Sequence, residues 1–216
     1  QVMVDISVKY QVERFLYIST DEVYGQLGPG EQSWTEEVPL NPRNPYSASK
    51  AAGELIVRAA SQTHGLKYNI TRCCNNFGPA QPPRNLVPKI VNNLLNNIPI
   101  PIHGNGKQFR EWIYVDDHCS AIMKIIEKAP INETYNVGSG VEYTNLQMVK
   151  NIANLLKIEA PPVSFVKDRP GHDFRYSVNC DKLHNLGWQP DFNFDTGLKK
   201  CVQWYVDNPW YYQSTI

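Results

Sequence analysis

The chain has 216 residues, with 21 basic and 21 acidic side chains, so its net charge is zero. This length is enough for one large domain or two small ones with a substantial core. The charge balance argues against nucleic acid or an anionic membrane as a partner, because the chain as a whole has no excess of positive charge to attract either of them. No apolar run approaches the ~20 residues of a membrane span, and no secretory signal pattern opens the chain.

The cysteines form an odd and scattered set without the spacing of metal ligands. They are Cys73, Cys74, Cys119, Cys180 and Cys201. We therefore expect reduced thiols in a cytoplasmic protein and no metal site.

The first strong signal is an apolar run, Phe15 to Ile18, which predicts a buried strand after a helical segment at residues 1–10. The strand ends in Thr20, Asp21 and Glu22. Ligands of open α/β sheets bind at the carboxyl ends of strands, so this triplet is expected beside a substrate. Taken alone, the two carboxylates fit a solvated loop better.

Downstream, Tyr46 and Lys50 are four residues apart, which places both on one face of a predicted helix. A phenol beside an ammonium is a potential acid/base pair. The simpler alternatives are a partly buried tyrosine and a surface lysine. The helix continues from Ala51 to Thr63 and is ended by Gly65.

The rest of the chain alternates between short strands and helices. A strand at 68–72 ends in a loop at 73–79, where Asn75 and Asn76 either face the same crevice or simply form a turn. The segment from His103 to Gly106 predicts a hairpin. Asp117 indicates the start of a helix, and Thr144 is expected to cap another helix. The further elements are helices at 87–97, 121–127, 146–156 and 196–206 and strands at 112–115, 135–137 and 163–166.

Tyr46-Ser-Ala-Ser-Lys50, after a strand that ends in Thr20, resembles the Tyr-x-x-x-Lys signature of the extended short-chain dehydrogenase/reductase superfamily. The run from Ser19 to Gly25, with adjacent Asp and Glu, resembles the nucleotide-sugar 4,6-dehydratases, above all those acting on dTDP-glucose. The segments NNFGP, DRPGHD and LGW agree with this.

The resemblance implies an α/β fold: the C-terminal part of a Rossmann-like doubly wound parallel sheet, plus a smaller α/β substrate-binding domain. Residues 1–78 would belong to the first and 79–216 mainly to the second, with a return to the first sheet around 103–140. The Gly-rich turn of a dinucleotide site does not appear in the sequence. We therefore expect about two upstream βαβ units of ~30 residues or more each to be missing.

The implied cofactor is NAD and the implied substrate a nucleotide-diphosphate sugar. Tyr46, its phenolate stabilised by Lys50, would take a proton from the sugar 4-hydroxyl, which Thr20 would orient. Glu22 would then remove the C5 proton as general base. Asp21, kept protonated, would donate to the departing 6-hydroxyl.

Arg110, Arg169 and Arg175 are candidates for a diphosphate, because a guanidinium fork binds such oxygens in pairs. Surface salt bridges are an equally good reading, and the resemblance favours Arg110 and Arg169 as ligands. It also places Asn76 near the cofactor, with Tyr46 and Lys50. The predicted substrate-binding set is Thr20, Asn75, Asn85, Leu86, His103, Arg110, Asn145, Arg169 and His172.

Some positions depart from the family pattern. Pro83-Arg84-Asn85 stands where Pro-Glu-Lys is common, and His103 stands where Tyr is common. The nucleotide thus stays open between dTDP and UDP. A sugar-nucleotide epimerase, which needs no carboxyl pair, and a sugar-nucleotide-binding fragment without turnover are the alternatives. The resemblance implies a homodimer formed through the helix that bears Tyr46.

Overall fold

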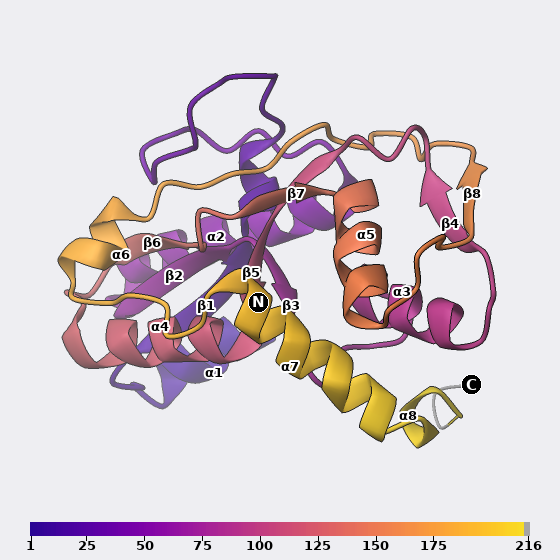
Figure 1. Ribbon diagram of the computed structural model, residues 1–216. Coiled ribbons are helices and arrows are strands. Elements are labelled where there is room, and N and C mark those ends of the chain that lie inside the picture. The colour runs from indigo at the N-terminus through magenta and orange to yellow at the C-terminus, as the bar shows by residue number, and fades with distance from the viewer. Residues whose placement is uncertain (214–216) are drawn as a thin grey trace.

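The computed structural model describes residues 1–213, and the chain alternates between helices and short strands (Figure 1). The helices are α1 (Val2–Lys9), α2 (Pro45–His64), α3 (Leu86–Leu95), α4 (Val115–Lys128), α5 (Asn145–Leu155), α6 (Asp181–Asn185), α7 (Phe194–Asp207), α8 (Trp210–Gln213) and the 3-10 turn η1 (Asp21–Tyr24). The strands are β1 (Phe15–Thr20), β2 (Tyr68–Cys73), β3 (Asn75–Phe77), β4 (Ile100–His103), β5 (Phe109–Tyr114), β6 (Glu133–Val137), β7 (Glu142–Thr144) and β8 (Val163–Val166). The α/β class expected from the sequence is confirmed.

The sheet that carries β1 is parallel, in the order β1-β2-β6. Every residue of β2 is buried, because helices cover both faces of the sheet. Val4 of α1 and Val57 of α2 pack with Ile70 on one face, and Ala121 and Ile125 of α4 belong to the cluster on the other. This arrangement aligns the carboxyl ends of β1 and β2 at one edge.

The other described strands form two small sheets. In one, β5 pairs in parallel with β3 and antiparallel with β7, and in the other β4 pairs in parallel with β8. Helices α3, α5 and α7 pack beside them around a second core that includes Ile90, Met148 and Leu198. Because β6 pairs with β2, the second half of the chain also contributes to the first sheet. The division at residue 78 stays a prediction.

Three helix ends follow the expected local rules. Asn44 and Ser47 form a capping box before α2, Pro45 occupies its first turn, and Gly65 ends it in the left-handed region at φ 70°. Thr144 caps α5 through the main-chain nitrogen of Gln147, as predicted. These caps fix where the helix that bears Tyr46 begins.

The hairpin predicted at His103 to Gly106 is wrong. Gly104 and Gly106 do form a turn with positive φ, but β4 and β5, which flank it, do not pair with each other. Their partners come from distant segments, so long-range pairing overrides the local turn signal. The strands β3 and β7 and the short helix α6 were not predicted. Helix α4 begins at Val115, two residues before the predicted start.

No helix within residues 1–213 is both long and apolar enough to cross a bilayer.

A buried ion pair joins β2 to α2. The guanidinium of Arg72 donates to Glu54 at 2.7 Å, and both side chains are at most 2% exposed. Arg72 also donates to the hydroxyl of Tyr24 at 2.8 Å, and that hydroxyl donates to Asn136 of β6 at 2.7 Å. One guanidinium therefore connects η1, α2, β2 and, through Tyr24, β6.

Glu54→Gln is expected to lower the free energy of unfolding by about 3 kcal/mol, because it leaves the buried Arg72 charge without a counter-charge. Urea unfolding at neutral pH measures the effect. Glu142→Gln is the matched control, since its partner Arg175 is more exposed, and it should cost about 1 kcal/mol or less. Equal losses in the two variants would contradict the assigned role of the pair.

Candidate active site

Two adjoining cavities lie at the carboxyl ends of the strands. The first, of about 310 Å³, is lined by all five predicted catalytic residues and by Asn76. The second, of about 360 Å³, is lined by every predicted substrate-binding residue except Thr20, which lines the first. The two cavities share Asn75, Asn76, Gln81 and Asn85. The structure thus brings the predicted residues together in one continuous region.

Asp21 is held as a buried acid at the end of β1. It is 2% exposed, and its Oδ1 accepts a hydrogen bond from Thr20 at 3.2 Å. Its Oδ2 has no hydrogen-bond partner among the described residues. Burial, and then the neighbouring charge of Glu22, raise the pKa of Asp21 well above its usual value. A carboxyl group in this setting keeps its proton to a higher pH than a solvated carboxyl does, and it can therefore serve as a proton donor.

Glu22 lies in a different environment, although it is the next residue. It is half-buried, and its Oε2 accepts a hydrogen bond from Asn44 Nδ2 at 3.0 Å. Asn44 is also the N-cap of α2, so the carboxylate is fixed relative to Tyr46, which lies in the first turn of that helix. Adjacent carboxyls in such unlike surroundings can serve as one acid and one base.

Tyr46 and Lys50 both face the first cavity from α2. Lys50 donates to the carbonyl oxygen of Ile18, and its ammonium lies 4.9 Å from the centre of the Tyr17 ring. Burial, followed by the charge of Glu22, raises the pKa of Tyr46 rather than lowering it. The ammonium of Lys50 is bonded to the main chain in this arrangement, so the stabilisation of the phenolate by Lys50 stays a prediction.

His118, which was not predicted as a site residue, lines the same cavity as Cys73 and Cys74. Its Nδ1 lies 2.9 Å from Asn76 Oδ1, and Asn76 Nδ2 donates to Cys73 Sγ at 3.4 Å. Burial opposes ionisation of Cys73, but its neighbours Cys74, His118 and Asn76 bring its pKa down to about 6. The sequence feature that could have indicated His118 as a site residue is its position in the first turn of a helix that directly follows a strand.

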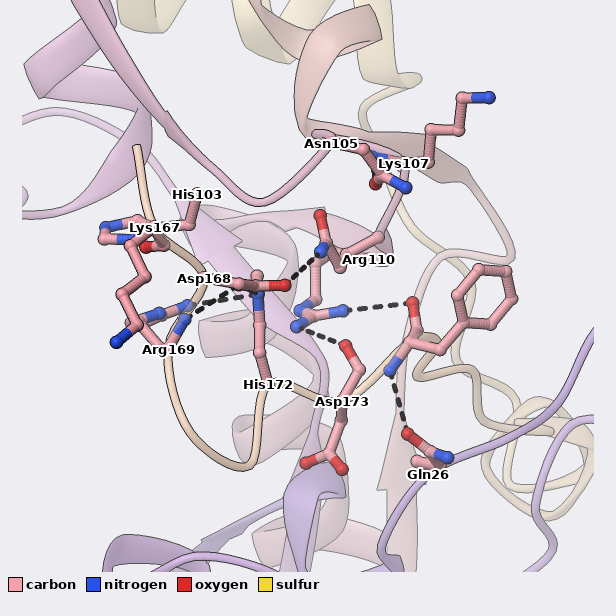
Figure 2. A network of polar contacts seen from close by, with 12 residues as sticks. Gln26, His103, Asn105, Lys107, Arg110, Lys167, Asp168, Arg169, His172 and Asp173 are labelled. Atoms are coloured by element: carbon pink, nitrogen blue, oxygen red, sulfur yellow. Dashed lines mark hydrogen bonds and ion pairs between the residues drawn. The ribbon is translucent and has the colours of Figure 1, made fainter. Parts of the chain in front are cut away.

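The three candidate arginines have different surroundings. Arg110 is buried, donates to the main-chain oxygens of Phe109 and Asp173, and lies 4.3 Å above the Tyr176 ring. Arg175 makes two 2.6 Å bonds to Glu142, which is the salt-bridge alternative. Arg169 is exposed and lines the second cavity beside His172 (Figure 2). Of the three, Arg169 has the guanidinium most available to a ligand.

Glu111 is a second buried acid, and its role is structural. Its carboxyl oxygens accept the main-chain N–H groups of Gly140 at 2.8 Å and Val178 at 2.9 Å. A Cβ on Gly138 would lie 2.2 Å from Glu111 Oε1, so the main chain approaches it closely. Burial raises the pKa of Glu111 to about 7, although these hydrogen bonds oppose the shift.

No group of three or more His, Cys, Asp or Glu residues in the described part of the chain is arranged to hold a metal ion.

A parallel α/β sheet with Thr20-Asp21-Glu22 at a strand end, opposite Tyr46 and Lys50, defines a domain of the extended short-chain dehydrogenase/reductase type. The model of the GDP-mannose 4,6 dehydratase family matches residues 2–201, and the chain belongs to that family. The resemblance inferred from the sequence motifs is confirmed.

Three similar proteins show which known proteins the chain resembles. Low-salt glycan biosynthesis protein Agl12 of Haloferax volcanii is 45% identical, over 95% of this chain and 66% of its own length. dTDP-glucose 4,6-dehydratase of Neisseria meningitidis is 42% identical, over 97% of this chain and 62% of its own length. The crystal structure of DesIV, a dTDP-glucose 4,6-dehydratase of Streptomyces venezuelae with NAD bound, has a TM-score of 0.95 at 40% identity, over 99% and 66%. The chain spans less than two thirds of each relative.

The raised pKa of Glu111 predicts that this residue makes stability fall as pH rises. The unfolded chain releases the proton near pH 4.3, whereas the folded chain keeps it to about 7, so the stabilisation is complete below the first value and lost through the second. Urea unfolding of wild type and Glu111→Gln between pH 4 and 8 should change their difference by about 3 kcal/mol in favour of Gln. Glu127→Gln, at an exposed position, is the control. A pH-independent difference between wild type and Glu111→Gln would show that the group does not titrate this way.

Proposed function

We propose that the protein is an NAD-dependent nucleotide-sugar 4,6-dehydratase that converts dTDP-glucose to dTDP-4-keto-6-deoxyglucose. The observation that carries the proposal is the pair Asp21 and Glu22, one buried with a raised pKa and one half-buried. Elimination of water needs a proton donor and a proton acceptor at the same time. The similarity to the Neisseria and Streptomyces dehydratases supports dTDP-glucose as the substrate.

The first cavity has side chains that fit the nicotinamide end of NAD. Tyr46 and Lys50 offer a hydroxyl and an ammonium, and the buried Ser19 Oγ has no hydrogen-bond partner among the described residues. Such groups suit the hydroxyls of a ribose and the amide of a nicotinamide. When bound, NAD would supply the acceptor, and later the donor, of one hydride. The Gly-rich turn that holds a pyrophosphate has no counterpart in the sequence, so these residues would hold only this end.

The first chemical task falls to Tyr46 and Thr20. Tyr46 would accept the proton of the sugar 4-hydroxyl, and Thr20 Oγ1, at the end of β1, would orient that oxygen. The raised pKa of Tyr46 opposes ionisation. The ammonium of Lys50, one helical turn away, would therefore have to turn from the Ile18 carbonyl toward the phenol.

The second task falls to the two carboxyl groups. A ketone at C4 acidifies the C5 proton, which Glu22 would remove. Asp21, kept neutral by burial, would protonate the 6-hydroxyl, which leaves as water. After the hydride returns to C6, the proton held by Glu22 would return to C5. The charge of Glu22 also contributes to the raised pKa of Asp21, so the proposed base helps to keep the proposed acid protonated.

The alternatives differ in what they require. An epimerase would use Thr20, Tyr46 and Lys50 and leave the acid pair without a role. UDP in place of dTDP stays open, because Arg84 and His103 line the second cavity where the family pattern differs. A fragment that only binds sugar nucleotides is the alternative from another class, given that the chain spans less than two thirds of its relatives.

Two further features belong to the proposal. The exposed apolar side chains Val2, Met3 and Ile6 of α1 and Leu55 of α2 would suit a homodimer packed through these helices. All five cysteines are free thiols, which suits the reducing cytoplasm.

The direct test is mass spectrometry of dTDP-glucose and UDP-glucose after incubation with NAD and the protein, using residues 1–216 and any longer protein that contains them. We expect loss of one water. Glu22→Gln and Asp21→Asn should each lower the rate by about 10²-fold or more, because each removes one partner of the proton transfer.

Glu37→Gln, a nearby exposed position outside the cavities, should retain the wild-type rate. A C4 epimer has the same mass as the substrate, so the products are also separated by chromatography. A product of unchanged mass that elutes as the C4 epimer would assign the epimerase reaction instead. Absence of any product with the longer protein would overturn the proposal.

A further inference from the structure

The carboxylate of Asp168 is one of the groups that attach the loop after β8 to the wall of the second cavity. Asp168 Oδ1 accepts from His172 Nδ1 at 2.6 Å and from the main-chain nitrogen of Arg169 at 2.9 Å. Its Oδ2 accepts from Gln108 Nε2 at 3.2 Å, just before β5 (Figure 2). A Cβ on Gly104 would lie 2.5 Å from this oxygen, so the approach depends on a glycine there.

The histidine of this loop has one defined tautomer. Its Nε2 lies 3.2 Å from Nη2 of Arg169, and a guanidinium can only donate a hydrogen bond. Nε2 is therefore the unprotonated acceptor, and Nδ1 carries the hydrogen that is donated to Asp168. The ring thus connects the carboxylate to the guanidinium in a chain of three groups.

The same ring is poorly placed to bind a ligand itself. The side chain of His172 is 4% exposed, and both ring nitrogens already have partners. Arg169 is exposed and lines the cavity, and one of its donors is used by the ring. The remaining donors of this guanidinium are available to the cavity.

We infer that His172 is a positioning residue, which as a neutral hydrogen-bond acceptor holds Arg169 toward the diphosphate of the nucleotide sugar, while Asp168 fixes its tautomer. The identity of the ligand rests on the proposed function. Protonation of His172 would place an N–H against the guanidinium and release Arg169. Affinity for the nucleotide sugar then falls as the pH falls through the pKa of His172.

The charges around the ring agree with a neutral form near pH 7. They are Asp168, Arg169 and Asp173 from its own loop, Arg110 from β5, His103 from β4, Arg84 from the segment before α3, Lys89 from α3, and Glu22, which lines a further cavity of about 380 Å³ together with His172. Burial lowers the pKa of His172, the hydrogen bond to Asp168 opposes this, and Arg110 and Arg169 lower it further. Acidification below the ordinary histidine range is thus needed to protonate it.

The test is isothermal titration calorimetry with dTDP-glucose, without added NAD, from pH 5 to pH 8. This probe is a diphosphate diester, so its own charge is constant over that range. Wild type should bind about tenfold more weakly at pH 5 than at pH 8. His172→Gln should keep the affinity of pH 8 at both ends, because a glutamine can accept from Arg169, donate to Asp168, and does not titrate.

A double-mutant cycle separates positioning from direct contact. His172→Phe should weaken binding about tenfold in wild type and not at all in an Arg169→Ala background. Additive losses, or failure of Gln to restore affinity, would overturn the inference. Urea unfolding midpoints of all variants distinguish lost binding from lost fold. If wild type binds neither dTDP-glucose nor UDP-glucose, the proposed function fails, and the inference falls with it.

Discussion

The buried pairing of Arg72 with Glu54 is the interaction on which the geometry of the site depends. It joins the end of β2 to the middle of α2, and Tyr24 extends it to β6. Burying two charges is expensive, and the expense is offset only where hydrogen bonds satisfy the groups around them. Here Arg72 donates to Glu54, to Tyr24 and to the main-chain oxygen of Glu36. The helix that carries Tyr46 is thereby fixed relative to the strand that ends in Thr20.

The same packing explains why an acid with a raised pKa lies at this edge, and burial has the same effect on Glu111 within β5 of the neighbouring sheet. Parallel strands covered on both faces direct their carboxyl ends, and the polar residues that follow, into a region with little water. Asp21 and Glu111 both become harder to ionise, but their hydrogen bonds differ. Glu111 accepts two main-chain N–H groups and holds loops together, whereas one oxygen of Asp21 has no partner among the described residues. Of the two acids, only Asp21 therefore has a carboxyl oxygen that is available for chemistry.

The sequence was informative where a local signal decides the outcome. The strand before Thr20, the capped helix with Tyr46 and the cap at Thr144 all follow short-range rules, and family motifs indicated the residues that line the cavities. The turn after His103 was misread, because β4 and β8 pair across a large sequence separation. The direction of the Lys50 side chain and the contacts of His118 depend on tertiary packing, which no spacing of residues encodes.

The arginines of the second cavity show why residue type alone does not assign a role. Arg110 and Arg169 were equal candidates for the diphosphate. Arg110, however, donates hydrogen bonds to main-chain oxygens and lies over an aromatic ring. A guanidinium held in this way gives the cavity wall a fixed positive charge. It has little freedom to move with a ligand. Arg169 is exposed and bonded to a neutral ring, so its orientation depends on one acceptor. A rigid cation beside an adjustable one would suit the function proposed for this cavity, in which a diphosphate is held while the sugar reaches Asp21 and Glu22.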